Sequence, residues 1–356
     1  MIIPSIGFNS RLNPDELVDQ VTRWSLLGQV ALTDVTPADG EILEYLIKRV
    51  GGSVDILIEF SEPDQSQILA ALNAGATRIL SAQPEPNCES IPPERFLMIR
   101  NDDAPDQAVA PGCVLNLPHP TSDRIAELEM ARVDCVVGVE HLTSKLIADF
   151  FQAVLVTDRS DGLWPTVIVD PLGVALGLAY SSYESLIHAI ETRCGTYWSR
   201  SRDGLWIKGQ SSGATQQLLG IRLDCDRDSL RFSVTQDPPG FCHRNTYTCF
   251  GSERTIQSVI ERISSRLSDS DENSFTRKLA ADPQMLKSKL LEESGELAES
   301  NQSGDPHEIA WEAADVLYFS LVSMLNHGVS LDRVFHELTR RMNRVVRRDP
   351  GIRPTD

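Results

Sequence analysis

The feature that most restricts the fold is that the hydrophobic pattern of this 356-residue chain changes twice along its length. In residues 1–160 short apolar runs alternate with helical stretches, residues 161–251 are β-rich, and residues 252–349 are helical nearly throughout. Because strands and helices repeat with different periods, such changes mark domain boundaries. We therefore predict three domains with these bounds, followed by a linker-like tail at 350–356.

The first domain is predicted to be an α/β layer. Its apolar runs read as buried strands, and a helical pattern at 64–75 ends in Gly75, which suits a helix C-cap. The strands are expected at 54–60, 77–81, 96–100, 133–139 and 153–158. This alternation favours a largely parallel sheet, with part of a (βα) barrel as one form of it. Since no phosphate-binding glycine loop or catalytic cluster is present, we assign this domain no chemistry.

The other two domains are predicted to be α+β and all-α. The middle domain combines one helix at 183–192 with strands at 164–170, 173–180, 195–209, 219–226 and 230–236. The last has helices at 254–267, 283–300, 306–328 and 331–348, which predict a four-helix bundle. Asp282 and Asp305 each precede a proline, the pattern of a helix N-cap, and Gly328 ends the third helix.

The net charge of −18, from 51 acidic and 33 basic side chains, argues against a nucleic-acid polymer or an anionic membrane as partner. Residues 1–160 carry −13 of it, so an anionic substrate is expected elsewhere. No apolar run is long enough to span a membrane, and the start MIIPSIGFNS has no secretion-signal pattern. Together with an odd number of cysteines, seven, these features predict a reduced, cytoplasmic protein.

Four carboxylates occur in pairs on two consecutive predicted helices. Glu293 and Glu296 are three residues apart, as are Glu312 and Asp315, so each pair shares a helix face. A single Glu-x-x-Glu is usually a solvated face, but two pairs across a helix hairpin form an oxygen cage suited to Mg²⁺. Apolar neighbours indicate that part of this face is buried, where unpaired negative charges require a cation. The four residues therefore predict a Mg²⁺ site.

The segments carrying these acids resemble the all-α nucleoside-triphosphate pyrophosphohydrolases, whose hallmark is ExxE followed by ExxD. More narrowly, three segments are similar to phosphoribosyl-ATP pyrophosphohydrolase of histidine biosynthesis. They are SFTRKLAADP (274–283), KLLEESGELAES (289–300) and EIAWEAADVLYFSLV (308–322). The resemblance implies Mg²⁺-dependent hydrolysis of the α–β phosphoanhydride with release of pyrophosphate.

Several basic residues near these segments are candidate phosphate contacts. The resemblance makes Arg277, Lys278 and Lys289 such candidates. The C-terminal arginines are either further contacts or, as we favour, cations placed at a helix C-terminus: Arg340, Arg341, Arg344, Arg347 and Arg348.

Three aspartates alternate in LDCDRD (223–228). In an extended strand, Asp224, Asp226 and Asp228 would share one face, and Cys225 would point the other way. Three hard oxygen ligands suit Mg²⁺, whereas a thiolate suits Zn²⁺.

Two further cysteines follow in the same domain. Cys225, Cys242 and Cys249 would supply three thiolates and leave a fourth tetrahedral position open, as a hydrolytic zinc requires. His243 has three interpretations, namely a further ligand, a catalytic base or a packing residue.

These residues lie in three blocks that resemble phosphoribosyl-AMP cyclohydrolase: YWSRSRDGLWIKGQSSGATQ (197–216), LDCDRDSLRFSVTQ (223–236) and FCHRNTYTCF (241–250). The resemblance implies a homodimer with zinc sites shared between subunits, Zn²⁺ on the three cysteines and Mg²⁺ on the three aspartates. It also implies zinc-dependent hydrolytic opening of the adenine ring at N1–C6. The resemblance further implies two sets of substrate contacts. A KGxxSG block supplies Lys208, Ser212 and Gly213, and a WSRSR block supplies Arg200 and Arg202.

The two resemblances together predict a bifunctional hydrolase, because the product of the first reaction is the substrate of the second. The predicted substrates are the nucleotides phosphoribosyl-ATP and phosphoribosyl-AMP. The layout resembles the N-terminal part of the fungal multifunctional histidine proteins, in which a histidinol dehydrogenase domain follows, so we expect this chain to be a truncated form. Two alternatives stay open: a general pyrophosphohydrolase of noncanonical dNTPs, and a metal-stabilised scaffold with dead sites.

Overall fold

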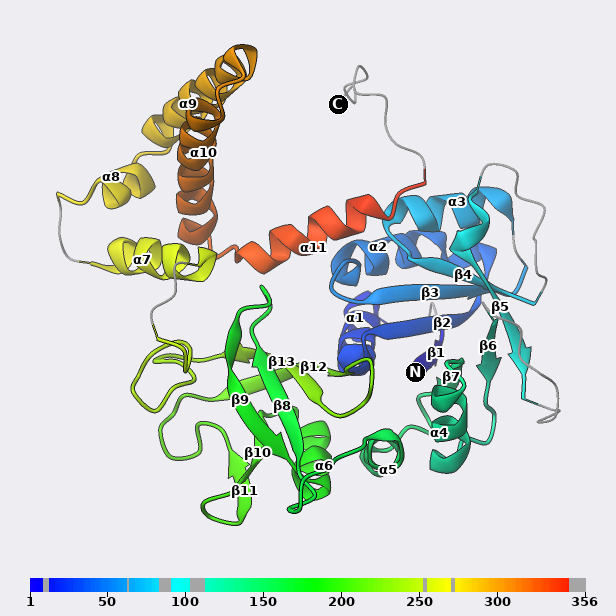
Figure 1. The fold of residues 1–356 in the computed structure, drawn as a ribbon. Coiled ribbons are helices and arrows are strands. Elements are labelled where there is room, and N and C mark those ends of the chain that lie inside the picture. The colour runs from blue at the N-terminus through cyan, green and yellow to red at the C-terminus, as the bar shows by residue number, and fades with distance from the viewer. Residues whose placement is uncertain are drawn as a thin grey trace. The chain divides into compact units, whose positions relative to one another are not determined.

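A computed structural model describes residues 1–8, 13–62, 64–82, 91–102, 113–251, 255–269 and 273–345 (Figure 1). The chain forms two compact units, Met1–Cys249 with His336–Asp356, and Phe250–Phe335. The tail predicted at 350–356 lies outside the described residues. Within them, no helix is both long and apolar enough to cross a bilayer.

The first unit begins with a closed barrel of parallel strands, in which β1 to β7 pair in chain order and β7 pairs back with β1. The strands are β1 (Ile2–Gly7), β2 (Gln29–Val35), β3 (Asp55–Phe60), β4 (Arg78–Ser81), β5 (Phe96–Asn101), β6 (Cys113–Asn116) and β7 (Asp134–Gly138). The predicted parallel α/β domain is confirmed, and it is a closed barrel rather than part of one. The strands β1, β2 and β6 were not predicted from the sequence.

The barrel interior is a layer of apolar side chains, and helices cover its outer face. The layer contains Ile3, Ala31, Leu57, Leu80, Val114 and Val136, with Leu97 of β5 packed against it. The helices are α1 (Pro14–Trp24), α2 (Gly40–Val50), α3 (Gln65–Ala74), α4 (Ser122–Met130) and α5 (Ser144–Val154), with 3-10 turns η1 (Ser25–Leu27), η2 (Pro37–Asp39) and η3 (Pro93–Arg95). Alternating side chains fill the interior from every strand, so the barrel is a packed core and not a pore.

A β-rich part follows within the same unit. Four strands form a mixed sheet in the order β12-β13-β8-β9, in which only the β13–β8 pair is parallel, and β10 and β11 form a separate hairpin. Their bounds are β8 (Trp164–Val169), β9 (Ala175–Ser181), β10 (Thr196–Ser199), β11 (Gly204–Ile207), β12 (Gln216–Leu223) and β13 (Leu230–Gln236). Helix α6 (Tyr183–Thr192) has the predicted bounds, and the side chain of Ser182 caps its N-terminus.

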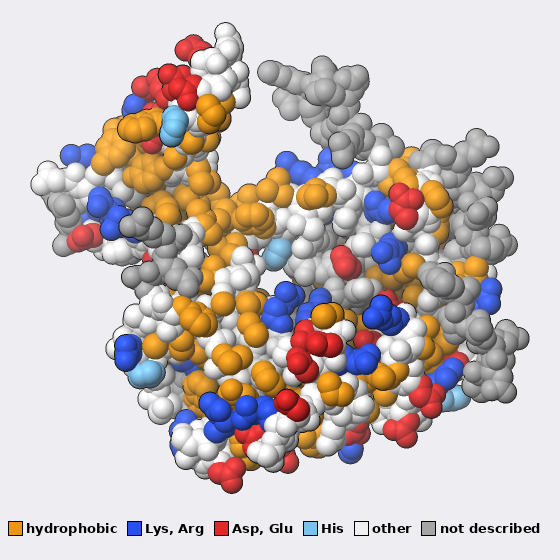
Figure 2. Space-filling view, viewed as in Figure 1, with side chains coloured by type: hydrophobic (Ala, Val, Ile, Leu, Met, Phe, Trp, Pro, Cys, Tyr) orange, Lys and Arg blue, Asp and Glu red, His pale blue; other side chains and the backbone are white. Residues whose placement is uncertain are grey.

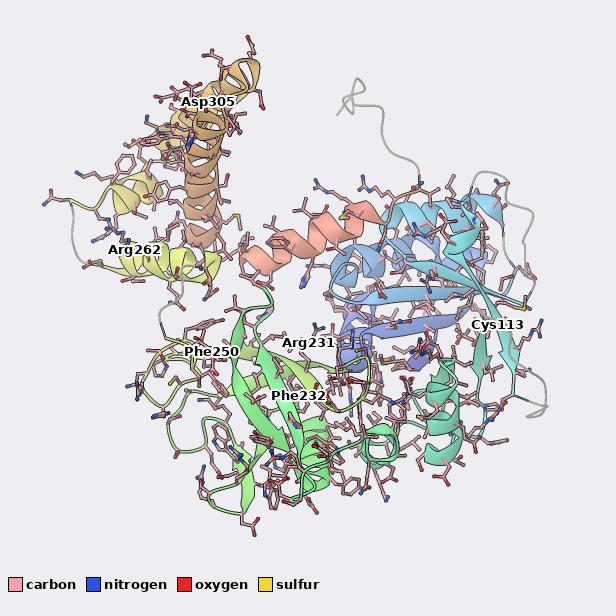
Figure 3. The ribbon with its side chains drawn as sticks, in the orientation of Figure 1. Cys113, Arg231, Phe232, Phe250, Arg262 and Asp305 are labelled. Carbon is pink, nitrogen blue, oxygen red and sulfur yellow. The ribbon has the colours of Figure 1, made fainter. Side chains whose placement is uncertain are left out.

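The barrel and the β-rich part share one hydrophobic core. Leu26 of η1 and Phe150 and Phe151 of α5 belong to the same buried cluster as Ile168 of β8 and Phe232 of β13, which Figure 3 labels. Burial of this apolar surface stabilises both parts at once. The domain boundary that we predicted near residue 160 therefore falls inside one compact unit and stays a proposal.

The second unit is helical. It contains α7 (Ile256–Ser268), α8 (Phe275–Ala281), α9 (Pro283–Ser303), α10 (Pro306–Asn326) and the first residues of α11 (Leu331–Met342). The predicted caps are confirmed, since the Asp282 side chain accepts from the backbone of Gln284 and Met285, and that of Asp305 accepts from the backbone of His307. Each cap satisfies amides that have no partner inside the helix.

The expected four-helix bundle is wrong in one respect. The fourth predicted helix, α11, ends at Met342, and its residues from His336 onward belong to the first unit. There the Arg340 guanidinium is buried and donates to the Ala74 carbonyl oxygen at 2.6 Å, at the end of α3. Arg340 and Arg341 lie in the last turn of α11, where a cation is favoured, as predicted. The Arg340 guanidinium in addition binds the C-terminal end of α3.

Two predicted strands are also wrong. Residues 153–158 form the end of α5 and an irregular segment, because a short apolar run does not distinguish a strand from a buried helix end. The strand expected at 219–226 ends at Leu223, and the aspartates follow it in a turn.

Candidate functional site

The first candidate site lies between α9 and α10. Carboxylate oxygens of Glu293, Glu296 and Glu312 lie within 4.8 Å of one another, and such a group has the ligands for a metal ion. Glu293 is only 8% exposed, whereas Glu296 is exposed. The two helices meet at Gly304, whose positive φ of 67° ends α9, and Asp305 then caps α10. This hairpin brings the two Glu-containing faces together.

The electrostatics of Glu312 favour a cation here. Burial, followed by the negative charges of Glu296, Glu293 and Asp315, raises the pKa of Glu312. Its Oε2 atom is buried and has no hydrogen-bond partner among the residues that the structure describes. A buried carboxylate oxygen without a partner is costly, and a hard divalent cation relieves both the repulsion and the missing partner. The residues present therefore fit Mg²⁺, with Asp315 near Glu312 but outside the three-residue group.

The predicted phosphate contacts of the helical unit have different surroundings. Lys289 contacts Glu292 at 3.0 Å and Glu293 at 3.6 Å, so its ammonium group lies beside the carboxylate cluster. The Arg277 guanidinium donates to the backbone carbonyl of Asp269 at 2.6 Å. Lys278 is exposed. Among the described residues, Lys289 is the one of these three cations that forms an ion pair with a carboxylate of the cluster.

The second candidate site is the turn between β12 and β13. Carboxylate oxygens of Asp224, Asp226 and Asp228 lie within 4.8 Å of one another, although the residues form a turn and not the strand we expected. Arg227 has a φ of 63°, the left-handed conformation that lets the chain reverse. The Asp224 side chain organises the turn by accepting from the backbone of Asp228 and from the hydroxyl of Ser229, at 3.0 and 2.6 Å.

These aspartates are exposed, and their carboxyl groups influence one another. A hydrogen bond with Asp224 and the negative charge of Asp226 raise the pKa of Asp228. The pKa of Asp224 is lowered, because its hydrogen bonds with Ser229 outweigh burial, which acts in the opposite direction. Three carboxyl groups this close together can share a hard cation that neutralises them. The donor set therefore suits Mg²⁺.

The cysteines are divided in the structure. Cys242 and Cys249 lie in one loop. Burial and then the Cys242 thiolate raise the pKa of Cys249, while backbone and side-chain donors in the same loop lower the pKa of Cys242. Two adjacent thiols of this kind fit zinc. Cys225 is exposed in the aspartate turn, and within the described residues it forms no three-ligand group with the other two.

Close packing holds the cysteine loop against β9. The Cys249 amide donates to the Leu176 carbonyl at 2.8 Å. A Cβ at Gly177 would lie 2.4 Å from the Phe241 ring and 3.2 Å from the Cys249 sulfur, so this position requires glycine.

Lys208, which we predicted to contact the substrate, is buried rather than on the surface. It is only 6% exposed, and its ammonium group donates to the carbonyls of Ala214 at 3.1 Å and Gly240 at 3.4 Å. It thereby joins the turn before β12 to the loop that carries Cys242 and Cys249. Burial lowers the pKa of Lys208, and the two thiols oppose that shift.

We expect Lys208→Met to lower the free energy of unfolding of the first unit by about 2 kcal/mol, because two buried carbonyls are left without their donor. Urea unfolding followed by tryptophan fluorescence measures this decrease. The matched control is Lys145→Met, which removes an exposed i,i+4 ion pair with Asp149 and is expected to change stability by less than about 0.5 kcal/mol. Unchanged stability in Lys208→Met, with a raised KM, would instead support a direct substrate contact.

The other predicted residues of the β-rich part are exposed. The Arg200 guanidinium stacks 4.0 Å from the ring centre of Tyr180, and Arg202 donates to the Ser199 hydroxyl at 3.3 Å. Ser212 and Gly213 lie in the turn before β12, where Gly213 has a φ of 75° and open space around it. His243 is exposed, with its Nδ1 4.0 Å from the Cys242 sulfur.

Sequence reasoning missed residues that support both sites. Ser229 fixes Asp224, and the Thr276 hydroxyl hydrogen-bonds the Tyr318 hydroxyl at 2.9 Å, joining α8 to α10 one turn from Asp315. The signal available for Ser229 was its position in an Asp-rich turn, where hydroxyl and amide donors commonly bind an aspartate. No local pattern pairs Thr276 with Tyr318, because they are 42 residues apart.

Comparison with known proteins identifies two family segments. The family model for phosphoribosyl-AMP cyclohydrolase matches residues 177–251, and that for phosphoribosyl-ATP pyrophosphohydrolase matches residues 256–342. The aspartate turn and the cysteines at 225, 242 and 249 lie in the first segment, and the α9–α10 carboxylates lie in the second.

Whole-chain relatives are found among proteins of histidine biosynthesis. The chain is 32% identical over 353 residues to a histidine biosynthesis trifunctional protein of Saccharomyces bayanus, covering 95% of this chain but only 42% of the relative. It is 37% identical to the bifunctional protein his7 of Schizosaccharomyces pombe, covering 74% of this chain and 65% of that protein. The bifunctional protein HisIE of Bacillus subtilis is 35% identical over 200 residues, which cover 52% of this chain and 95% of HisIE. The chain thus spans less than half the length of its trifunctional relatives.

Proposed function

The chain belongs to the family of histidine biosynthesis bifunctional proteins, and we propose that it catalyses two consecutive hydrolyses of that pathway. The first converts phosphoribosyl-ATP to phosphoribosyl-AMP and pyrophosphate. The second adds water across the N1–C6 bond of the adenine ring and opens it. One observation carries the proposal. Within the described residues, two groups of acids have the spacing of metal ligands, and each matched segment contains one of these groups.

The α9–α10 cluster is proposed to bind Mg²⁺ for the pyrophosphohydrolase reaction. Glu293, Glu296, Glu312 and Asp315 would hold the ion, which when bound neutralises the triphosphate and activates water. The chain's own contribution is to keep these carboxylates close together despite their repulsion, by placing them on two packed helices. Lys289, beside Glu293, supplies a positive charge near the substrate's phosphates.

The β-rich part is proposed to bind Zn²⁺ and Mg²⁺ for ring opening. Cys242 and Cys249 would hold zinc with Cys225, and the three aspartates of the turn would hold Mg²⁺. Zinc at such a site supplies Lewis-acid activation of water. His243, exposed beside Cys242, is proposed as the group that takes up or releases a proton.

We propose a cytoplasmic homodimer as the working form. Cys225 is not grouped with the other two cysteines within the described part of one chain, as expected if the partner subunit completes the zinc site. In the helical unit, Trp311 of α10 is 72% exposed and Leu291 of α9 is 66% exposed. Figure 2 shows hydrophobic side chains gathered on the surface of this unit. Apolar surface of this kind favours pairing with a second copy.

The function is tested by supplying phosphoribosyl-ATP with Mg²⁺ and Zn²⁺ and measuring pyrophosphate and the ring-opened imidazole over time. Both products are expected, with pyrophosphate appearing first because its reaction supplies the second substrate. Noncanonical dNTPs are expected to react at least ~100-fold more slowly in kcat/KM, a difference that unpaired polar groups in a specific site readily produce. Comparable dNTP hydrolysis would indicate a general pyrophosphohydrolase, and no product from any substrate would indicate a scaffold.

A further inference from the structure

A polar cavity of about 620 Å³ lies in the helical unit, apart from the residues assigned so far. One face of α7 lines it, together with Ser274 at the start of α8. Figure 3 labels Arg262 on that helix. Its volume is in the range of small-molecule sites, which are typically about 300–1,000 Å³.

Three of the side chains that line the cavity have no partner among the described residues. Arg262 and Arg266, one helical turn apart, have no ion pair or hydrogen bond to any residue that the structure describes. Ser274 is 9% exposed, and its buried hydroxyl has no hydrogen-bond partner among the described residues and does not cap α8. Arg262 and Arg266 are exposed, whereas a buried hydroxyl without a partner is rare in folded proteins. Ser274, which lines the same cavity as the two arginines, therefore points to a bound ligand.

The described lining of the cavity carries two arginines and two acids, Glu261 and Asp269, so its side-chain charges balance. Glu261 accepts from the side chain of Gln257 at 3.4 Å, and Arg262 and Arg266 supply the cationic groups. The Arg277 guanidinium, bound to the Asp269 carbonyl, adds a third cation at this edge. Arginine recognises phosphate oxygens with paired hydrogen bonds, so the chemistry matches a phosphate monoester.

A hydrogen bond links α8, which begins beside the cavity, to α10, which carries part of the carboxylate cluster. Two residues after Ser274, the Thr276 hydroxyl hydrogen-bonds the Tyr318 hydroxyl on α10. Tyr318 is three residues from Asp315 and therefore one turn along the same helix face. A substrate that binds both places would therefore extend from the carboxylates of α10 toward the start of α8.

We propose that this cavity binds the phosphate monoester of the substrate's phosphoribosyl group, an inference that rests on the proposed pyrophosphohydrolase function. The substrate has two anionic ends of different kinds. Its triphosphate needs a metal to lie beside carboxylates, whereas its monoester is matched by arginines alone. Arg262, Arg266 and Ser274 therefore determine specificity, because ATP and other nucleoside triphosphates lack the second phosphate that they bind.

The test is the double variant R262M/R266M in the full chain, assayed for pyrophosphate release from phosphoribosyl-ATP. We expect KM to rise by about 100-fold, at roughly 10-fold for each arginine–phosphate interaction that is removed, with kcat changed by less than about threefold. Ribose 5-phosphate is expected to inhibit the wild type competitively but not the double variant. The matched control is Lys287→Met, an exposed lysine of α9, which is expected to leave KM unchanged.

Ser274→Ala provides a second variant that does not depend on the arginines. We expect it to raise KM severalfold while the melting temperature stays the same or rises, because it removes a buried hydroxyl without a partner. A structural role for Ser274 predicts a lower melting temperature instead. An unchanged KM in R262M/R266M, or an equal rise in Lys287→Met, would overturn the inference.

The inference and the proposed function fail in different ways. If the wild type releases no pyrophosphate from phosphoribosyl-ATP, the proposed function is wrong, and calorimetric binding of ribose 5-phosphate still tests the cavity. Binding that disappears in R262M/R266M supports the phosphate site, and binding that is absent or insensitive to the double variant overturns it.

Discussion

Glu293→Gln is expected to reduce pyrophosphate release from phosphoribosyl-ATP by at least about 100-fold, and ring opening falls with it. Glu293 is the most buried member of the carboxylate cluster, and its amide replacement removes one of the negative charges that would hold Mg²⁺. Ring opening fails because its substrate is no longer made. Adding phosphoribosyl-AMP directly is therefore expected to restore ring opening in this variant, which the imidazole product reports.

Glu292→Gln is the matched control for Glu293. It lies next to Glu293 on α9, is exposed and pairs with Lys289, but it is not a member of the cluster. We expect near-normal turnover from it, because exposed ion pairs contribute little. Equal losses in the two glutamine variants would show that general charge, rather than a metal site, is responsible.

A thermal measurement separates metal binding from catalysis. Without divalent cations, Glu293→Gln is expected to melt at the same or a higher temperature than the wild type, because repulsion within the cluster decreases. Mg²⁺ is expected to raise the melting temperature of the wild type by binding the folded state, and to do so much less in the variant. A decrease in the stability of the metal-free variant would contradict this account.

Cys249→Ser is expected to stop ring opening while pyrophosphate release continues, so that phosphoribosyl-AMP accumulates. The reduction in ring opening is expected to be at least about 100-fold, because a hydroxyl replaces a thiolate in the proposed zinc site. Chromatography of the nucleotides measures the accumulated intermediate, and mass spectrometry measures the decrease in bound zinc. If Cys249→Ser leaves ring opening intact, the zinc assignment is wrong.

Cys194→Ser is the matched control, since this partly exposed thiol of the same β-rich part is not a proposed ligand and donates to the Thr192 carbonyl. Mixing two inactive chains tests the shared site. A dimer of one Cys225→Ser and one Cys249→Ser chain contains one intact site if Cys225 comes from the partner subunit. Recovered ring opening supports the shared arrangement, whereas no recovery in verified mixed dimers contradicts it.

The predicted elements were most accurate where short-range patterns determine the structure. Helix α6 has the predicted bounds, and Asp282 and Asp305 cap α9 and α10 as expected. These features depend on residues within a few positions of each other, because a cap binds amides of the first helical turn. The strands β3, β4, β5 and β7 were found from apolar runs for the same reason.

The predictions that were wrong or incomplete concern features that depend on contacts between residues far apart in the sequence. The run at 153–158 is apolar because α5 packs on the core shared with the β-rich part, and not because it joins a sheet. Closure of the barrel depends on β1 pairing with β7, more than 100 residues later, which no local pattern reports. Helix α11 has a helical sequence, but only tertiary structure shows that Arg340 binds the end of α3.

For the candidate sites, the sequence by itself determined which residues offer ligands and that Glu293 and Glu296 share one helix face, since helical spacing sets that geometry. Only the tertiary structure decided that Glu312 lies beside them with a buried oxygen that has no partner among the described residues. It also decided that the aspartates lie in a turn rather than on a strand, and that Lys208 is buried against two carbonyls. The cavity of Arg262 and Arg266 also required it. The physical reason is that periodicity specifies the face a side chain occupies, whereas burial and partners depend on which distant segment packs against that face.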